Sequence, residues 1–249
     1  MEKIDLKENV KCSICQDTGW VFKDEGVVKC QCQYNLNNTQ VNHSLNIPKK
    51  YFHANLENFL DYGLPSRKLI IQKVKEYIYS DEMEEGKGFF FYGKNGVGKT
   101  HLAVAILKEI YTLKGITGTF YDTRILLYDL KATFEGNSST RELLDSVIKS
   151  PILVLDDLGS ERLSDWAKDI LHYIIISRYN DKLPVIITSN IYFEKYDKES
   201  EDIESKFGKG IASRLNEICY PILVEGEDFR KTQINNTLKR LGNGKKGVY

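Results

Sequence analysis

Short apolar runs that end in glycine or polar residues recur along this chain and predict buried strands of a parallel sheet. These runs occupy residues 89–92, 118–122, 151–157, 184–190 and 220–224. Apolar residues at helical spacing predict helices over residues 69–78, 102–110, 124–134, 140–148, 166–180 and 211–218. Residues 194–209 are charged and predict a loop. Because strands and helices alternate, we expect an α/β doubly wound fold with helices flanking a parallel sheet.

A glycine-rich segment follows the first strand and precedes a helix, and it matches the pattern G-x-x-x-x-G-K-S/T over residues 93–100. Glycines let backbone N–H groups close around phosphate oxygens, and the helix directs its positive end at them. Lys99 is expected to reach the β- and γ-phosphates of ATP, and the Thr100 hydroxyl to bind magnesium. The predicted nucleotide contacts are Gly93, Lys94, Asn95, Gly96, Val97, Gly98, Lys99, Thr100 and His101.

Polar residues end two of the later strands, at the sheet edge where α/β proteins bind their ligands. Asp156 and Asp157 close the run at residues 151–157, and Asn190 closes the run at residues 184–190. We expect Asp156 to hold magnesium, usually through water, and Asp157 to polarise the attacking water. Asn190 is placed to orient that water from the opposite side, although on position alone Ser189 and Asn190 can equally cap a turn.

Four of the five cysteines lie near the start of the chain, as Cys12-x-x-Cys15 and Cys30-x-Cys32. Two such pairs can supply a closed tetrahedral zinc shell, and four free thiols are the alternative. Residues 18–29 between the pairs predict a hairpin, and the Asn- and Gln-rich residues 34–44 predict a linker. We therefore expect a zinc-binding module and linker over residues 1–45 and a single larger domain over residues 46–249.

Composition narrows the classes of protein to which this chain can belong. Its 249 residues are 41% hydrophobic, which is enough for a sizeable core, and 35 basic side chains balance 35 acidic ones. With zero net charge, nucleic acid must be bound through local patches. The basic residues after Asp228 are one such patch or a solvated tail. The start lacks the apolar core of a signal peptide, and no stretch is long enough to span a membrane, so we expect a cytoplasmic protein.

Several of these motifs together resemble one known family. The segments GKNGVGKTHLA, ILVLDDLG, RYNDKLPVIITSN and ASRLNEICYPILVEGEDFRK are similar to those of the bacterial replicative helicase loaders DnaC and DnaI. These loaders are a branch of the AAA+ ATPases that includes the transposition helper IstB. The segments CSICQDTGW and KCQC resemble the zinc module of DnaI-like loaders.

The resemblance implies roles for further residues. Asn190 matches the sensor-1 residue, Arg214 the arginine finger that completes a neighbouring subunit's site, and Arg230 the sensor-2 arginine. The helices over residues 124–148 match an extra helical element that lines a DNA channel, where Arg124, Lys131 and Arg141 are candidate contacts or simply solvated charges. Asp157 is one methylene shorter than the glutamate of many AAA+ enzymes, so we expect slow hydrolysis that a partner or DNA stimulates.

The family role predicted from this resemblance is ATP-dependent loading of a hexameric replicative helicase onto single-stranded DNA. The cofactors expected are ATP, magnesium and zinc, and the ATP-bound protein is expected to form a homo-oligomer. Two other hypotheses stay open. One is an IstB-like transposition helper that remodels duplex DNA, and the other is a zinc adaptor that binds but does not hydrolyse ATP.

Overall fold

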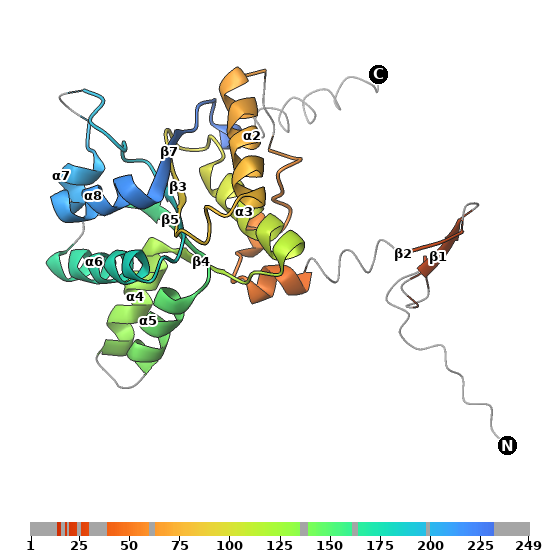
Figure 1. Ribbon diagram of the computed structural model, residues 1–249, viewed down its shortest axis with the longest axis horizontal. Helices are drawn as coiled ribbons and strands as arrows, with labels where there is room; N and C mark the ends of the chain where they lie inside the picture. The colour runs from red at the N-terminus through yellow and green to blue at the C-terminus, as the bar shows by residue number, and fades with distance from the viewer. Residues whose placement is uncertain are drawn as a thin grey trace, which may run out of the picture.

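The computed structural model describes residues 14–15, 18, 20–23, 26–29, 39–59, 63–134, 139–160, 164–197 and 200–231. Its centre is a parallel sheet of five strands in the order β4-β5-β6-β3-β7. The strands are β3 Gly88–Tyr92, β4 Thr119–Asp122, β5 Leu153–Leu158, β6 Val185–Ser189 and β7 Cys219–Leu223. The predicted α/β fold with a helix-flanked parallel sheet is confirmed (Figure 1).

Strand β3 lies inside the sheet, between β6 and β7, and its aromatic side chains alternate between the two faces. Phe89 and Phe91 belong to the apolar core on one face, and Phe90 belongs to the core on the other. All three are fully buried, and the Phe90 ring meets the Phe193 ring edge to face, with centroids 5.1 Å apart. A run of consecutive apolar residues is therefore needed here because both faces of the strand are covered.

Helices cover both faces of the sheet. On the face of Phe89 and Phe91 lie α2 Pro65–Tyr79 and α3 Lys99–Lys114. On the face of Phe90 lie α4 Thr123–Phe134, α5 Ser139–Lys149, α6 Asp165–Asn180 and α8 Lys209–Ile218. Within the described ranges, no helix is both long enough and apolar enough to span a membrane.

The segment before the sheet is part of this domain. Residues 39–44 are helical, η1 Lys49–Tyr51 follows as a short 3-10 helix, and Leu45 is fully buried in the core under α2 and α3. The Leu45 carbonyl accepts a hydrogen bond of 2.9 Å from the Phe120 N–H at the edge strand β4. The prediction of a linker over residues 34–44 is therefore wrong for residues 39–44, because Val41 and Leu45 supply apolar contacts one helical turn apart.

A second correction concerns residues 194–209. They contain α7 Ile203–Phe207, whose N-terminus has a capping box between Asp202 and Ser205. Ile203 and Phe207 are buried, so two apolar residues at helical spacing anchor a short helix in a segment otherwise dominated by charge.

The predicted hairpin is confirmed as a separate two-stranded antiparallel sheet, β1 Trp20–Lys23 and β2 Gly26–Lys29. Of the four predicted zinc ligands, the structure describes only Cys15, which is buried. Cys12, Cys30 and Cys32 lie outside the described residues. The described residues contain no cluster of three or more potential metal ligands, so the zinc site stays a prediction.

Candidate nucleotide-binding site

The loop between β3 and α3 has the backbone that its glycines allow. Gly93, Gly96 and Gly98 all have positive φ, at 138°, 78° and 103°. A Cβ atom at Gly93 would lie 2.5 Å from the Val224 carbonyl oxygen, so a larger residue does not fit there. The loop is also held from outside, since the Phe229 N–H donates to the Gly96 carbonyl over 3.1 Å.

Helix α3 begins directly at Lys99, and its N-cap, Gly98, offers no side chain to the helix end. The N–H groups of the first turn are therefore available to an anion, and the helix dipole favours one. The Lys99 ammonium turns back across the loop and donates 2.8 Å hydrogen bonds to the Gly93 and Lys94 carbonyls and to Asn190 Oδ1. Burial lowers the pKa of Lys99 to about 8, against the opposing attraction of Asp157 and Asp156.

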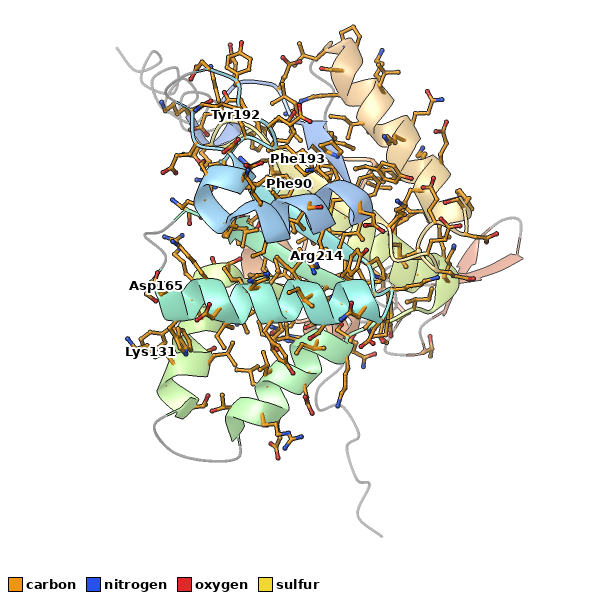
Figure 2. All side chains as sticks on the ribbon, turned by 60° about the vertical axis from the view of Figure 1, so that its left-hand side comes forward. Phe90, Lys131, Asp165, Tyr192, Phe193 and Arg214 are labelled. Carbon is orange, nitrogen blue, oxygen red and sulfur yellow. The ribbon has the colours of Figure 1, made fainter. Side chains whose placement is uncertain are left out.

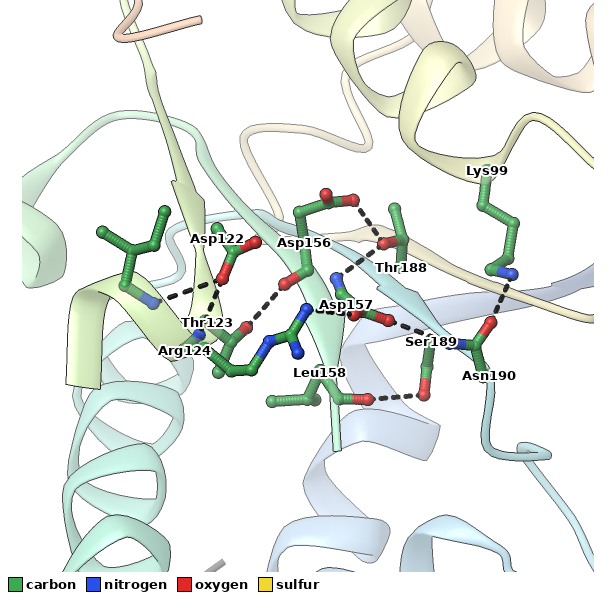
Figure 3. A network of polar contacts seen from close by, with 11 residues as sticks. Lys99, Asp122, Thr123, Arg124, Asp156, Asp157, Leu158, Thr188, Ser189 and Asn190 are labelled. Atoms are coloured by element: carbon green, nitrogen blue, oxygen red, sulfur yellow. Dashed lines mark hydrogen bonds and ion pairs between the residues drawn. The ribbon is translucent and has the colours of Figure 1, made fainter. Parts of the chain in front are cut away.

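The ends of β5 and β6 are joined through Thr188, a residue that the sequence did not single out. Its hydroxyl donates to Asp156 Oδ1 over 2.6 Å and accepts a 2.9 Å hydrogen bond from the Asp157 N–H (Figure 3). Burial raises the pKa of Asp156, and hydrogen bonds from Thr188 and Thr100 oppose the rise. Thr100 and Asp156, the two predicted magnesium ligands, therefore lie close together.

Asp157 is held by both of its carboxylate oxygens. Asn190 Nδ2 donates to Oδ1 over 2.9 Å, and Arg124 Nη2 donates to Oδ2 over 3.2 Å (Figure 3). The backbone of Asp157 has a positive φ of 57°, which turns its side chain out of the strand pattern. Lys99, Asn190, Asp157 and Arg124 thus form one continuous chain of polar contacts, from the phosphate loop to the first turn of α4.

A polar cavity of about 460 Å³ opens beside this chain of contacts. Asp157 and Asn190 form one part of its wall, and the loop residue Asn95 forms another. The remaining wall comes from the segments that follow β5 and β6, through Gly159, Ser160, Ile191, Tyr192, Glu201 and Lys206. The side chains predicted to act on water therefore face open space rather than packed core.

The remaining predicted residues divide into two groups. Arg230 lies near the site. Burial raises the pKa of Tyr51, and Thr100 and Arg230 oppose that rise, while the Arg230 charge also lowers the pKa of Lys99. Arg214 lies on α8 (Figure 2) and does not reach the site. Its guanidinium donates to the Gly210 carbonyl over 2.9 Å and lies 5.6 Å from the centroid of the Tyr179 ring of α6. The sequence offered no motif for Tyr51, which folding of the preceding segment brings to the loop.

The side chain of His101, a predicted nucleotide contact, packs against the segment over residues 53–59. His101 Nε2 lies 3.0 Å from the Asn55 carbonyl oxygen, and its ring packs against Phe59 and His53. Burial lowers the pKa of His101. Only the backbone of His101 is available to a phosphate, while its side chain fastens α3 to the segment over residues 53–59.

The groups gathered at this site are of the kinds that bind magnesium and a nucleoside triphosphate. A glycine loop at a bare helix N-terminus fits phosphate oxygens, and a threonine hydroxyl next to an aspartate offers the oxygen ligands that magnesium prefers. Fold and site together define a P-loop nucleotide-binding protein of the AAA+ type. The chain belongs to the family of IstB-like ATP binding proteins, whose model matches residues 15–237.

Known relatives agree with this assignment, and the predicted resemblance is confirmed. The chain is 29% identical over 179 residues to the replicative helicase loader DnaI of Bacillus subtilis (strain 168), covering 69% of this chain and 57% of DnaI. It is 30% identical over 167 residues to the replicative helicase loader DnaC of Escherichia coli (strain K12), covering 64% of this chain and 66% of DnaC.

A solved structure is similar as well. The crystal structure of a DnaC helicase loader superimposes with a TM-score of 0.65 at 41% sequence identity, covering 72% of this chain and all of that chain. The match to DnaI spans less than two thirds of that protein's length.

Proposed function

We propose that this protein is an ATP-dependent loader that places a replicative DNA helicase on single-stranded DNA. The observation that carries the proposal is the convergence of Lys99, Asp157 and Asn190 in one chain of hydrogen bonds at the sheet edge. The relatives are replicative helicase loaders, which supports a replicative helicase as the partner class. The proposed activity is ATP hydrolysis that switches assembly, DNA binding and release.

The roles of the site residues follow from their positions. Lys99 and the loop N–H groups bind the β- and γ-phosphates, and Thr100 and Asp156 hold magnesium. Magnesium, when bound, neutralises charge on the phosphates and draws electrons from the γ-phosphorus. Asp157 and Asn190 orient the attacking water from the polar cavity beside them, and Arg230 contacts the nucleotide from the C-terminal segment.

Arg214 is proposed to act in a neighbouring subunit. Its guanidinium lies on α8 and contacts the Gly210 carbonyl and the Tyr179 ring of α6, away from the phosphate loop of its own chain. An arginine on an outer helix can reach the γ-phosphate of an adjacent copy and offset transition-state charge. We therefore propose that ATP favours a homo-oligomer whose sites are completed between subunits.

We further propose two partner-binding regions. The module within residues 1–38, with zinc held by Cys12, Cys15, Cys30 and Cys32, binds the helicase. The domain that begins with the helix over residues 39–44 binds ATP and single-stranded DNA. On that domain, α4 and α5 carry the basic candidates Arg124, Lys131 and Arg141. A closed four-sulfur site leaves no coordination position for water, which fits a docking role rather than catalysis.

A reconstituted loading assay tests the function. The full chain, with ATP, is expected to capture a hexameric replicative helicase and transfer it to a single-stranded circle, and Lys99→Ala is expected to stop the transfer. A matched variant without residues 1–38 leaves the helix over residues 39–44 and the buried Leu45 in place, and it should keep ATP hydrolysis and lose helicase capture. Failure of the intact chain to bind the helicase under any nucleotide condition would refute the loader.

The family assignment itself favours one second candidate, an IstB-like transposition helper. Such a protein would bind a transposase and deform duplex DNA, so the same capture assay with a transposase separates the two functions. A non-hydrolysing zinc adaptor is the third hypothesis. It predicts no phosphate release even with single-stranded DNA and helicase present.

A further inference from the structure

We propose that Lys206 on α7 is a specificity residue of the nucleotide site, which distinguishes a nucleoside triphosphate from a diphosphate by leaving Glu201 for the γ-phosphate. The inference deepens the proposed function, and it rests on that function only for the binding of ATP at the phosphate loop. Its structural basis is the polar cavity at the sheet edge, whose wall contains Lys206 together with Asp157 and Asn190.

The cavity begins where the terminal phosphate of a bound nucleotide is expected. Lys99, the residue proposed to hold the β- and γ-phosphates, donates to Asn190 Oδ1 over 2.8 Å, and Asn190 lines the cavity. Asn95 of the phosphate loop lines it as well. With about 460 Å³, the cavity has room for a phosphoryl group and several waters, each of which occupies about 30 Å³ in the liquid. A γ-phosphate that projects from the loop therefore enters the space that these side chains surround.

The charges on the cavity wall call for a cation when a γ-phosphate is present. Asp157 and Glu201 are the acids among the described residues that line the cavity, and Lys206 is the one base among them. A γ-phosphate adds negative charge beside the Asp157 carboxylate, and like charges repel one another most strongly where water is scarce. The Lys206 ammonium is the group on this wall that can offset the repulsion. A diphosphate lacks the γ-phosphate and gains nothing from it.

The ion pair between Lys206 and Glu201 is suited to exchange. Lys206 Nζ lies 3.0 Å from Glu201 Oε2, and the lysine side chain is 18% exposed whereas the glutamate side chain is 64% exposed. An ion pair with a well-solvated partner contributes little to stability. A terminal phosphate carries more charge than a carboxylate and offers three acceptor oxygens to the three donors of an ammonium. Lys206 can therefore leave Glu201 for a phosphate with a net gain.

Packing holds α7 beside the cavity. Phe207, the neighbour of Lys206 in the sequence, is buried, and a Cβ atom at Gly159 in the cavity wall would lie 3.2 Å from the Phe207 ring. The Tyr192 N–H, just beyond β6, donates to the Glu201 carbonyl over 3.1 Å. These contacts join α7 to the segments that follow β5 and β6. A change of partner at Lys206 therefore requires only rotation of its side chain.

Nucleotide affinity tests the assignment without helicase, DNA or hydrolysis. The probes are ADP and the non-hydrolysable triphosphate β,γ-methylene-ATP, each titrated calorimetrically into the full chain with magnesium present. Lys206→Gln removes the charge and is expected to weaken binding of the triphosphate about five- to twentyfold, as for loss of a charged hydrogen bond at a partly solvated site, and to leave the affinity for ADP unchanged. Lys206→Arg keeps the charge and should retain most of the wild-type preference for the triphosphate.

Lys209→Gln is the matched control. Lys209 is a nearby lysine on α8 that is 90% exposed, lies 3.9 Å from Glu204 and is not among the residues that line the cavity. Both affinities should stay at their wild-type values in this variant. Equal weakening of both nucleotides by Lys206→Gln would overturn the proposal, because Lys206 would then support the fold of the site rather than contact the γ-phosphate. Unchanged triphosphate affinity, or the same loss in Lys209→Gln, would overturn it as well.

Glu201→Gln gives a second readout, because it removes the competing acceptor. It is expected to tighten triphosphate binding roughly two- to threefold and to have no effect in a Lys206→Gln background. Equal tightening in both backgrounds would overturn the proposed exchange, because Glu201 would then act by general repulsion. If the wild-type chain binds neither nucleotide, the proposed ATP function fails together with the inference. If the chain binds both and Lys206→Gln keeps the wild-type preference, only the inference fails.

Discussion

Lys99 Nζ donates a 2.8 Å hydrogen bond to the side-chain oxygen of Asn190, 91 residues later in the chain. The same ammonium is held by two carbonyls of its own loop. A nucleotide phosphate entering this loop must take the ammonium from these oxygens. Because Asn190 also donates to Asp157, we expect a phosphate in the loop to change the contacts of the carboxylate proposed to act on water.

Lys99→Ala is expected to abolish tight nucleotide binding. The substitution removes a charge-assisted hydrogen-bond donor, whose loss costs roughly 1.5–3 kcal/mol, or about ten- to a hundredfold in affinity. Titration calorimetry with ATP measures the loss. Lys114→Ala, at the far end of α3, is the control and should bind ATP as the wild type does. Unchanged affinity in Lys99→Ala would contradict the site assignment.

Nucleotide affinity is expected to fall as the pH rises through about 8. Burial lowers the Lys99 pKa to about 8, so above that pH the nucleotide-free protein holds this amine increasingly neutral. Phosphate binding favours the charged amine, and the protein must then take up a proton. Calorimetry at alkaline pH in buffers of different ionisation enthalpy should detect this uptake, and its absence would place the binding cation elsewhere.

Thr188→Val is expected to destabilise the fold and weaken the response to magnesium. The change keeps the shape but removes the Thr188 hydrogen bond to Asp156 Oδ1 and the acceptor of the Asp157 N–H. The cost in the free energy of unfolding is roughly 1–3 kcal/mol for each buried group left unpaired, as measured by urea denaturation. Thr112→Val, on the exposed side of α3, should change stability by far less.

Arg214→Ala is expected to leave ATP affinity of the isolated subunit intact and to lower hydrolysis by the assembled protein on the order of 10³-fold. Mixing provides the sharper test. Lys99→Ala subunits keep Arg214, and Arg214→Ala subunits keep an intact phosphate loop. In a mixed assembly, Arg214 of a Lys99→Ala subunit can complete the site of an Arg214→Ala neighbour, so part of the activity should return. If mixing restores nothing, Arg214 does not complete a neighbour's site.

The full chain is expected to carry zinc, with Cys12, Cys15, Cys30 and Cys32 as ligands. Metal analysis of the purified protein should find the ion, and Cys12→Ser with Cys30→Ser should remove it. Removal should weaken helicase capture and leave ATP affinity unchanged, because the phosphate loop contains no cysteine. Cys219→Ser is unsuitable as a neutral control because Cys219 is buried in the core.

The sequence predicted the sheet and the nucleotide loop well because their signals are local. Each of these signals can be recognised from neighbouring residues alone. They are the aromatic run of β3, the glycine pattern at residues 93–100 and the two aspartates near the end of β5. The helix α7 was missed because charged residues obscured its two apolar anchors. The helical residues 39–44 were missed because their apolar positions have meaning only when the rest of the core is present.

By itself, the sequence determined which residues are candidates for binding phosphate and magnesium, and that they lie at the ends of parallel strands. Both follow from the spacing of glycine, apolar and acidic residues along the chain. Only the tertiary structure decided that Arg124 meets Asp157, that Thr188 joins two aspartates, and that Tyr51 reaches Thr100. Those contacts join elements brought together by sheet order and helix packing, and no periodicity within one segment specifies a partner in another.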